Sequence, residues 1–416
     1  MRIAFLSDFH LGFSNKDREG EAFALAKAAL SQALKEKPDL VVLTGDLFNR
    51  DVPAQEDLLG AFLLLAQCRR AKQSGLKISV EKGSERKQAE FSGVPVISIH
   101  GTHEFRGRDF RNALEVLDSA GFLIYIHAAR AIVESEKEKI VFHGLGGVPE
   151  KKAKDALLKW APQPVKGAKN ILLLHQSFRE FLPFDDEMVA SLSIGDLPQG
   201  FDFTVNGHLH SHAEFSEQER TLIIPGSTII TQLKKAEAGI PKGFFIHDSL
   251  AEKTRFVELE EKRTFYYKKI RLENASQESA AEKVKEELGA ILGRAETQEK
   301  MKPLVRISLQ GTLAKGFSAG DIDLGAVLEK FSEKAVVSIA SSFAEEDFKV
   351  KLDELKKLQS EKKSIAEMGL GILEKNLAET EFGDAFDVRR MFRLLSEGET
   401  EKAIEILSKT SAEEAK

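Results

Sequence analysis

The sequence predicts an α/β fold that comprises more than one domain. Its amino-terminal part has apolar runs at Arg2–Ser7 and Leu40–Leu43, on either side of an amphipathic segment at Gly20–Lys37. This strand–helix–strand order is the unit of a parallel or mixed sheet. The run Leu40–Leu43 is continuous and β-branched at its centre, which is typical of a strand covered on both faces. A chain of 416 residues is long enough for two or three domains.

Composition narrows the class of protein. The net charge of -6 gives no global electrostatic reason to bind nucleic acid, so any such binding needs a local basic surface or a metal site. A single cysteine, Cys68, excludes an internal disulfide and fits a reducing compartment. No apolar run approaches the ~20 residues of a membrane-spanning helix, and the chain enters a strand at once. We therefore expect a soluble, cytoplasmic protein without a signal peptide.

The first 262 residues are predicted to form one domain. We expect helices at Gln55–Ser74 and Asp109–Gly121, the second with Asp109 as its cap and Gly121 at its end. Between them, Leu76–Gly93 is polar and is predicted to be a loop or a short hairpin. The further strands are predicted at Val94–Ile99, Leu123–Ile126, Ala131–Glu134, Lys139–His143, Asn170–Leu174, Phe203–Asn206, Thr221–Ile224 and Gly243–Asp248.

The sequence changes character after about Arg263. Residues 263–345 are predicted to be a small α+β domain, with strands at Tyr266–Leu272, Leu304–Leu309 and Ala335–Ser341 and one helix at Ser279–Gly293. Residues 346–416 form a third region. It begins with densely alternating charge at Asp347–Lys363, which indicates a solvated helix or linker. Amphipathic helices are then expected near Ile365–Asn376, Phe386–Leu395 and Thr400–Ser408.

Five predicted strand ends supply aspartate or histidine. If these ends lie on one edge of a doubly wound sheet, the side chains can meet there. In D-x-H and H-x-H, the two side chains share one strand face if the backbone stays extended. Carboxylates with neutral imidazoles suit Mn, Fe or Zn, and the lack of cysteine ligands argues against a structural zinc site. These residues are Asp8, His10, Asp46, His103, His175, His208 and His210.

Any one of these histidines could equally be a packing residue, whereas the whole set points to a metal site. Other histidines lack the pattern, and we expect packing or surface roles for them: His100, His127, His143 and His247. His212 continues the H-x-H alternation but has no counterpart role, so we leave it out of the set. Enzymes that hydrolyse phosphoesters commonly hold two metals about 3.5–4 Å apart, bridged by a carboxylate.

The order of the motifs resembles that of the calcineurin-like metallophosphoesterases across roughly the first 250 residues. The segments SDFHLG, GDLF, LLLHQS and NGHLH resemble the SbcD family of double-strand-break repair nucleases, whose archaeal and eukaryotic members are called meiotic recombination eleven. The resemblance implies a four-layer α/β core. It also implies a DNA-capping domain after Arg263, which carries KPLVRISLQG, and a helical tail that binds a coiled-coil ATPase.

The same resemblance implies a role for each residue of the set. Asp8, His10 and His210 would hold one metal, His175 and His208 would hold the second, and Asp46 would bridge both. His103 would be the acid, or the histidine that stabilises the phosphate beside the scissile bond. The implied cofactors are two Mn²⁺ ions per chain, with Mg²⁺ or another divalent cation as alternatives.

The sequence departs from the family pattern at three positions. Thr102 stands where the family has an asparagine that binds the second metal, and a threonine hydroxyl is a weaker and shorter ligand. Asn49 stands where the family often has a histidine that places the DNA phosphate for exonuclease action. Glu104 replaces the commoner aspartate, and we expect it to orient His103.

DNA contact is expected to be mostly to phosphates, with Arg106, Arg108 and Arg111 as candidates. A solvated charged loop is an equally good interpretation of each arginine alone.

The predicted function is that of a manganese-dependent DNA nuclease in double-strand-break repair. It would act as a single-strand endonuclease and a 3′-5′ double-strand exonuclease with an SbcC-like coiled-coil ATPase. The resemblance also implies a homodimer within a heterotetramer, formed through the helices near Gln55–Ser74 and Asp109–Gly121. Two alternatives stay open. One is a small-molecule phosphodiesterase on the same core; the other is a catalytically weak DNA-binding scaffold for the ATPase, whose second metal site is lost through Thr102.

Overall fold

The structure is a computed structural model. It describes residues 1–15, 17–107, 110–181, 191–217, 220–294, 301–314, 317–343 and 387–396, together with residues 370, 373, 374, 400, 402 and 404. The chain divides into two compact units. The first comprises Met1–Lys268, Lys285–Ile307 and Gly325–Ile339, and the second comprises Lys269–Val284, Ser308–Leu324 and Ala340–Lys416.

The first unit contains a six-stranded mixed sheet. The strands β1, β2, β5 and β6 run parallel to one another, whereas β13 is antiparallel to β1 and β14 is antiparallel to β13. All five residues of β2 are buried, as its continuous apolar run predicted. In order across the sheet the strands are β14 (Lys253–Glu258), β13 (Gly243–Asp248), β1 (Arg2–Leu6), β2 (Leu40–Thr44), β5 (Val96–Ile99) and β6 (Ile124–Tyr125).

An eight-stranded sheet completes the framework of this unit. Its centre is parallel, from β8 through β9 and β10 to β12, and the strands outside it pair in antiparallel fashion. In order across the sheet the strands are β11 (Ala213–Glu217), β12 (Arg220–Ile224), β10 (Phe203–Gly207), β9 (Lys169–His175), β8 (Lys139–Gly144), β7 (Ala129–Glu134), β3 (Lys77–Lys82) and β4 (Glu85–Gln88).

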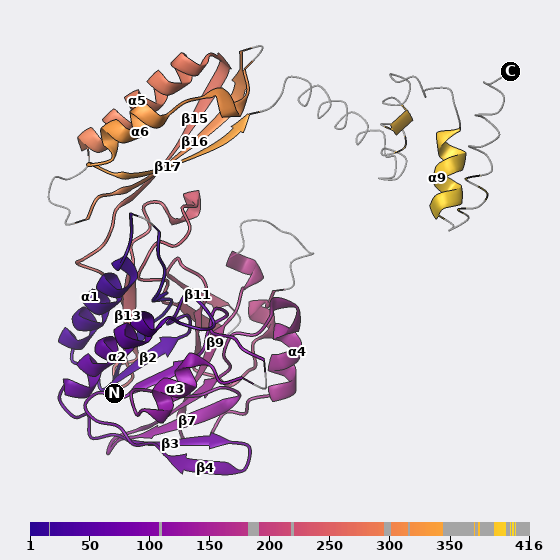
Figure 1. Ribbon diagram of the computed structural model, residues 1–416. Coiled ribbons are helices and arrows are strands. Elements are labelled where there is room, and N and C mark those ends of the chain that lie inside the picture. Colours follow the sequence, from indigo (N-terminus) through magenta and orange to yellow (C-terminus); the bar gives the residue numbers. More distant parts are fainter. Residues whose placement is uncertain are drawn as a thin grey trace. The chain divides into compact units, whose positions relative to one another are not determined.

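Helices cover the outer faces of the two sheets. The helices α1 (Glu21–Lys35), α2 (Gln55–Arg70) and α3 (Ala113–Ser119) pack on the six-stranded sheet, and α4 (Glu150–Trp160) packs on the eight-stranded sheet. Successive residues of β1 face different layers: Ala4 and Leu6 face the helices, whereas Ile3 and Phe5 lie in the apolar core between the sheets. Figure 1 shows α1 and α2 on one side of the strands and α4 on the other. The predicted four-layer α/β core is therefore confirmed.

Several boundaries differ from the sequence-based prediction. The segment 76–93 forms the hairpin of β3 and β4, one of the two predicted forms. Helix α2 ends at Arg70 instead of Ser74. Helix α3 begins at Ala113, because Asn112 caps it: the Asn112 side chain accepts a hydrogen bond from the Glu115 N–H, and the Glu115 carboxylate accepts one from the Asn112 N–H. Asp109, the predicted cap, lies outside the described residues. Helix α4 and the strands β11 and β14 were not predicted.

A three-stranded sheet follows, in the order β15 (Phe265–Ala275), β16 (Leu304–Leu313) and β17 (Val336–Phe343). These strands and α5 (Gln277–Arg294) confirm the predicted strands and helix, and α6 (Gly325–Phe331) is an additional short helix. The assignment of this region as a DNA-capping domain, and the boundaries 1–262, 263–345 and 346–416, stay predictions.

In the carboxyl-terminal region the helix α9 (Val388–Ser396) lies at the position predicted for a helix at residues 386–395. The predicted linker at residues 347–363 lies outside the described residues, as do most of the helices predicted near residues 365–376 and 400–408. Within the described part of the chain, no helix is both long enough and apolar enough to cross a bilayer.

Candidate metal centre

The side chains predicted to bind metal meet where the carboxyl ends of strands from both sheets approach each other. The strands β1, β2 and β5 come from the six-stranded sheet, and β9 and β10 come from the eight-stranded sheet. The expectation of one edge of a single doubly wound sheet was therefore wrong. Two stacked sheets bring the ends of five strands together because β2 packs against β9 and β10, and β5 packs against β9.

The backbone at these strand ends is not extended, so the predicted reason for the D-x-H spacing was also wrong. Asp8, His10, Asp46 and His208 have φ values of 53°, 50°, 50° and 74°, in the left-handed region that non-glycine residues rarely adopt. Backbone hydrogen bonds hold two of these turns against each other: Asp8 N–H donates to Gly45 O (3.1 Å) and His10 N–H donates to Asp46 O (3.0 Å). The turns, rather than a strand face, direct the side chains inward.

Two glycines leave room for the functional side chains. A Cβ atom on Gly101 would overlap the Asp46 carboxylate. A Cβ atom on Gly45, whose φ is 95°, would overlap the His175 ring. At both positions the missing side chain is what lets a buried charged or titratable group approach the backbone.

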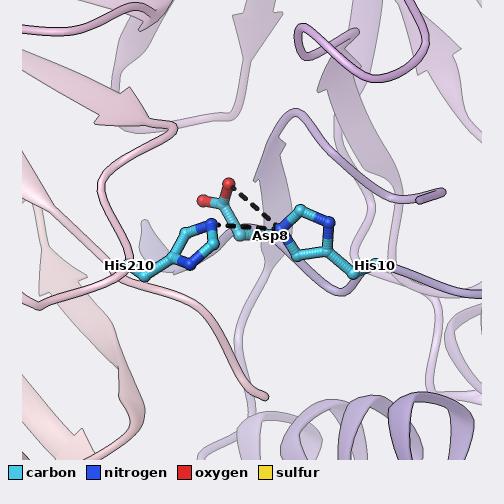
Figure 2. Close-up of side chains that lie close together, drawn as sticks. All are labelled: Asp8, His10 and His210. Carbon is cyan, nitrogen blue, oxygen red and sulfur yellow. Dashed lines mark hydrogen bonds and ion pairs between the residues drawn. The ribbon is translucent and has the colours of Figure 1, made fainter. Parts of the chain in front are cut away.

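The first cluster consists of Asp8, His10 and His210. Figure 2 shows the Asp8 carboxylate beside the two imidazole rings, whose nitrogens face each other. His10 Nε2 lies 3.2 Å from His210 Nε2 and 3.9 Å from Asp8 Oδ1. The other nitrogen of His210, Nδ1, lies 3.0 Å from the Thr231 hydroxyl and 3.8 Å from the Glu237 carboxylate, so both ring nitrogens of His210 face polar groups.

The second cluster consists of Asp46, His175 and His208. His175 donates from Nδ1 to the Thr44 carbonyl at 2.7 Å, which leaves Nε2 facing Asp46 Oδ2 at 3.2 Å. Thr102 Oγ1 lies 3.4 Å from His208 Nδ1, so the predicted weak ligand is beside this cluster. A third group, made of His10, Asp46 and His103, overlaps both clusters, and Asp46 therefore belongs to two of the three groups.

Burial and mutual charge set the protonation of these groups. Burial lowers the pKa of His10 and of His208 to about 3, so both imidazoles are neutral and can offer a lone pair. Burial acts in the same direction on His175, but the Asp46 carboxylate outweighs it and raises the pKa of His175 to about 10. The pKa of Asp46 lies below its usual range, because His175 outweighs the effect of burial. Burial raises the pKa of Asp8.

The donor set fits divalent cations. It combines two carboxylates with imidazoles that are neutral or whose proton a cation can displace, and these are ligands that Mn, Fe and Zn accept. His175 Nε2 is buried and faces the Asp46 carboxylate at 3.2 Å without the geometry of a hydrogen bond. Since buried polar atoms are nearly always paired, a cation held by this nitrogen and the carboxylate would supply the missing partner.

His103 lies at the exposed side of the cluster. Its side chain is 43% exposed, and Nε2 lies 3.9 Å from Asp46 Oδ2. Its backbone N–H donates to Asp46 Oδ1 at 2.9 Å, and its Nδ1 lies 2.9 Å from the Asn49 carbonyl oxygen. The ring is therefore partly open to solvent, while its Nδ1 and the backbone N–H of the residue face fixed partners.

The expectation that Glu104 orients the His103 ring was wrong. The buried Glu104 carboxylate accepts hydrogen bonds from the backbone N–H groups of Asp46, Phe48 and Gly101. The ring of His103 instead faces the Asn49 carbonyl, a backbone contact that does not depend on the side chain at position 49.

The predicted DNA-contact arginines are only partly described. The Arg106 guanidinium donates to the Arg111 carbonyl at 3.2 Å and lies 4.8 Å from the centre of the Phe110 ring. Arg108 lies outside the described residues. His100 pairs with the Tyr125 hydroxyl and the Gly147 carbonyl, and His212 stacks on Phe256, so neither joins the clusters.

Sequence reasoning missed the residues that surround the ligands. Thr44, Thr231 and Glu237 contact the outer nitrogens of His175 and His210, and Glu150 lies 3.5 Å from His208 Nε2. None of them belongs to a motif, and all except Thr44 lie in segments for which no role was predicted.

The fold and the clusters are those of a phosphoester-hydrolysing metalloenzyme class. The chain belongs to the calcineurin-like phosphoesterase family, whose sequence profile matches residues 1–212. It is similar to the DNA double-strand break repair protein Mre11 of Archaeoglobus fulgidus, with 25% identity over 390 residues that cover 85% of this chain and 80% of the relative. The resemblance predicted from the motifs is thus confirmed.

Two eukaryotic relatives match a shorter part of the chain. The double-strand break repair protein MRE11 of Encephalitozoon cuniculi is 28% identical over 255 residues, which cover 57% of this chain and 43% of the relative. The human protein of the same name is 24% identical over 278 residues, which cover 57% of this chain and 38% of the relative. The matched region is therefore less than half the length of these two relatives.

Proposed function

We propose that the chain is a manganese-dependent nuclease that processes DNA ends in double-strand-break repair. The proposal rests on Asp46, which belongs to two groups of possible ligands: one with His175 and His208, and one with His10 and His103. A carboxylate that bridges two cations must be shared in this way. The break-repair proteins among its relatives support DNA as the substrate. The proposed ligands are Asp8, His10, His210, His175, His208, Thr102 and the bridging Asp46.

Two bound cations would supply an activated water and would neutralise charge on the phosphate. The chain's own residues hold the site in shape: Thr44 fixes the ring of His175, and Thr231 contacts that of His210. His103 Nε2, exposed and close to Asp46, is placed to stabilise or protonate the departing 3′ oxygen. Arg106 and Arg108 would contact DNA phosphates, and Asn49 would border the substrate path.

The direct test is cleavage by the purified chain. We expect Mn²⁺-dependent cleavage of single-stranded and hairpin DNA, increased by an SbcC-like ATPase with ATP. Asp8→Ala should reduce it by about 10³-fold, since loss of metal-based charge stabilisation is worth several kcal/mol. No cleavage above the Asp8→Ala background, even with the ATPase, would leave the chain a scaffold. Turnover of a small phosphodiester without any DNA cleavage would favour the small-molecule alternative.

Exposed apolar side chains support the proposed partners. Leu59 and Leu63 on α2 and Val116 on α3 are about half exposed and could pair with a second copy of the chain. Phe392 and Leu395 on α9 are similarly exposed, which suits docking of a coiled-coil ATPase. Light scattering on the full chain should give the mass of a dimer at micromolar concentration, and a monomeric mass would contradict this pairing.

Thr102 gives a separate prediction about the second metal. Thr102→Asn should tighten binding of the second Mn²⁺ by about tenfold, because one better ligand contact worth about 1.4 kcal/mol changes affinity by that factor. Thr102→Val removes the hydroxyl at nearly constant volume and is the matched control, with binding no tighter than that of the parent. Equal affinity in parent and Thr102→Asn would show that position 102 does not contact the cation.

A further inference from the structure

We propose that Glu150 is a positioning residue of the second metal site and acts on it through His208. The inference rests on the proposed two-metal function. Glu150 is the first residue of α4, so it comes from a helix on the outer face of the eight-stranded sheet and not from any strand end that carries a proposed ligand. Its Oε1 lies 3.5 Å from His208 Nε2.

The two ring nitrogens of His208 face different partners. Nδ1 lies 3.4 Å from the hydroxyl of Thr102, whose neighbour His103 donates its backbone N–H to Asp46. Nδ1 is therefore the nitrogen on the side of Thr102, a proposed ligand of the same cation. Nε2 faces Glu150, which is absent from the cluster of close ligand atoms that Asp46, His175 and His208 form. Glu150 is thus a neighbour of the histidine and not of the cation position.

The Glu150 carboxylate is held in place and incompletely paired. Its Oε1 accepts a hydrogen bond from the Ser177 hydroxyl at 2.8 Å. Its Oε2 is buried and has no hydrogen-bond partner among the described residues, so the carboxylate is not fully paired. A carboxylate oxygen has two lone pairs, so Oε1 can accept a second hydrogen bond, and a proton on His208 Nε2, 3.5 Å away, would supply that donor. The same proton leaves the lone pair on Nδ1, the form of imidazole that binds a metal.

His208 differs in this respect from His175, whose outer nitrogen donates to the neutral carbonyl of Thr44. A carboxylate partner makes the imidazole a stronger ligand and adds negative charge near the cation. This matters most at the second site, because Thr102 offers only a neutral hydroxyl there. Glu150 therefore compensates for a weak ligand within the same cluster.

The test is Mn²⁺ binding to the full chain, measured by calorimetry and by the electron spin resonance of free Mn²⁺. We expect Glu150→Ala to weaken the second Mn²⁺ by about 10–100-fold and to leave the first unchanged. Glu150→Gln should weaken it less, because the amide oxygen still accepts the Nε2 proton and the side-chain volume is kept. Asp155→Asn is the matched control, since Asp155 is an exposed carboxylate on the same helix.

The outcomes separate this inference from the proposed function. A parent chain that binds fewer than two Mn²⁺ ions overturns both. A parent that binds two, with a Glu150→Ala variant that binds both equally well, overturns the role of Glu150 and leaves the nuclease proposal standing. If both affinities fall together in Glu150→Ala and in Glu150→Gln, Glu150 supports the fold of α4 and not His208, which also overturns the inference.

Discussion

Replacing Asp46 by asparagine is expected to reduce DNA cleavage by at least about 10³-fold, the largest loss that we predict for a single site. The substitution keeps the size of the side chain and an oxygen that can accept the His103 N–H, which now donates to Oδ1 at 2.9 Å. It removes the negative charge that lies 3.2 Å from His175 Nε2 and that two of the three clusters share. A neutral amide cannot hold two cations together, and the lost charge stabilisation is worth about 4 kcal/mol or more.

The same variant should bind Mn²⁺ differently from the parent. We expect fewer than two tightly bound Mn²⁺ ions per chain by calorimetry, with an unchanged circular dichroism spectrum. Asp51→Asn makes the same charge change at an exposed position of the same loop and should retain parental cleavage. Cleavage by Asp46→Asn within tenfold of the parent, with two bound Mn²⁺ ions, would exclude Asp46 as the bridge.

The positions of the ligands could be predicted because each depends on a short local pattern. The run Leu40–Leu43 followed by Gly45 and Asp46 contains both the buried strand and the turn that ends it. The same holds for Asn170–Leu174 with His175, where every strand residue from 170 onward is buried. Apolar runs that end in a polar residue predict a site at a sheet edge, whichever sheets contribute the edge.

What the sequence could not predict depends on contacts between distant segments. The number of sheets depends on which apolar strand faces pack against each other, and the sequence of a single strand does not show its packing partner. The left-handed backbone of Asp8, His10 and Asp46 is unfavourable locally and persists because the turns hydrogen-bond to each other. Glu150 approaches His208 from a helix 58 residues earlier, and no local pattern connects the two.

Glu104 illustrates the same limit and gives the second large effect. The resemblance to the family suggested that Glu104 is a partner for His103, but its carboxylate is fully buried and accepts three backbone hydrogen bonds: from Phe48 and Gly101 at 2.6 Å each and from Asp46 at 3.1 Å. It therefore fastens the turn after β2 to the turn after β5. Burial raises the pKa of Glu104 to about 8, whereas the N–H donors of Phe48 and Gly101 favour the ionised form.

Glu104→Ala is expected to lower the free energy of unfolding by about 3 kcal/mol, since each buried N–H left without a partner costs about 1–3 kcal/mol. Cleavage should fall as well, because the turns that carry Asp46 and His103 lose their common anchor. Urea denaturation of the metal-free chain measures the first effect, and Glu136→Ala, at an exposed glutamate, is the control. The stability of Glu104→Gln should lie between that of the parent and that of Glu104→Ala. Its amide oxygen can still accept the hydrogen bonds of one carboxylate oxygen, whereas its NH₂ group faces the N–H donors of the other and cannot accept from them. Parental stability in Glu104→Ala would mean that water satisfies these three donors, and the anchor would then lie elsewhere in the two turns.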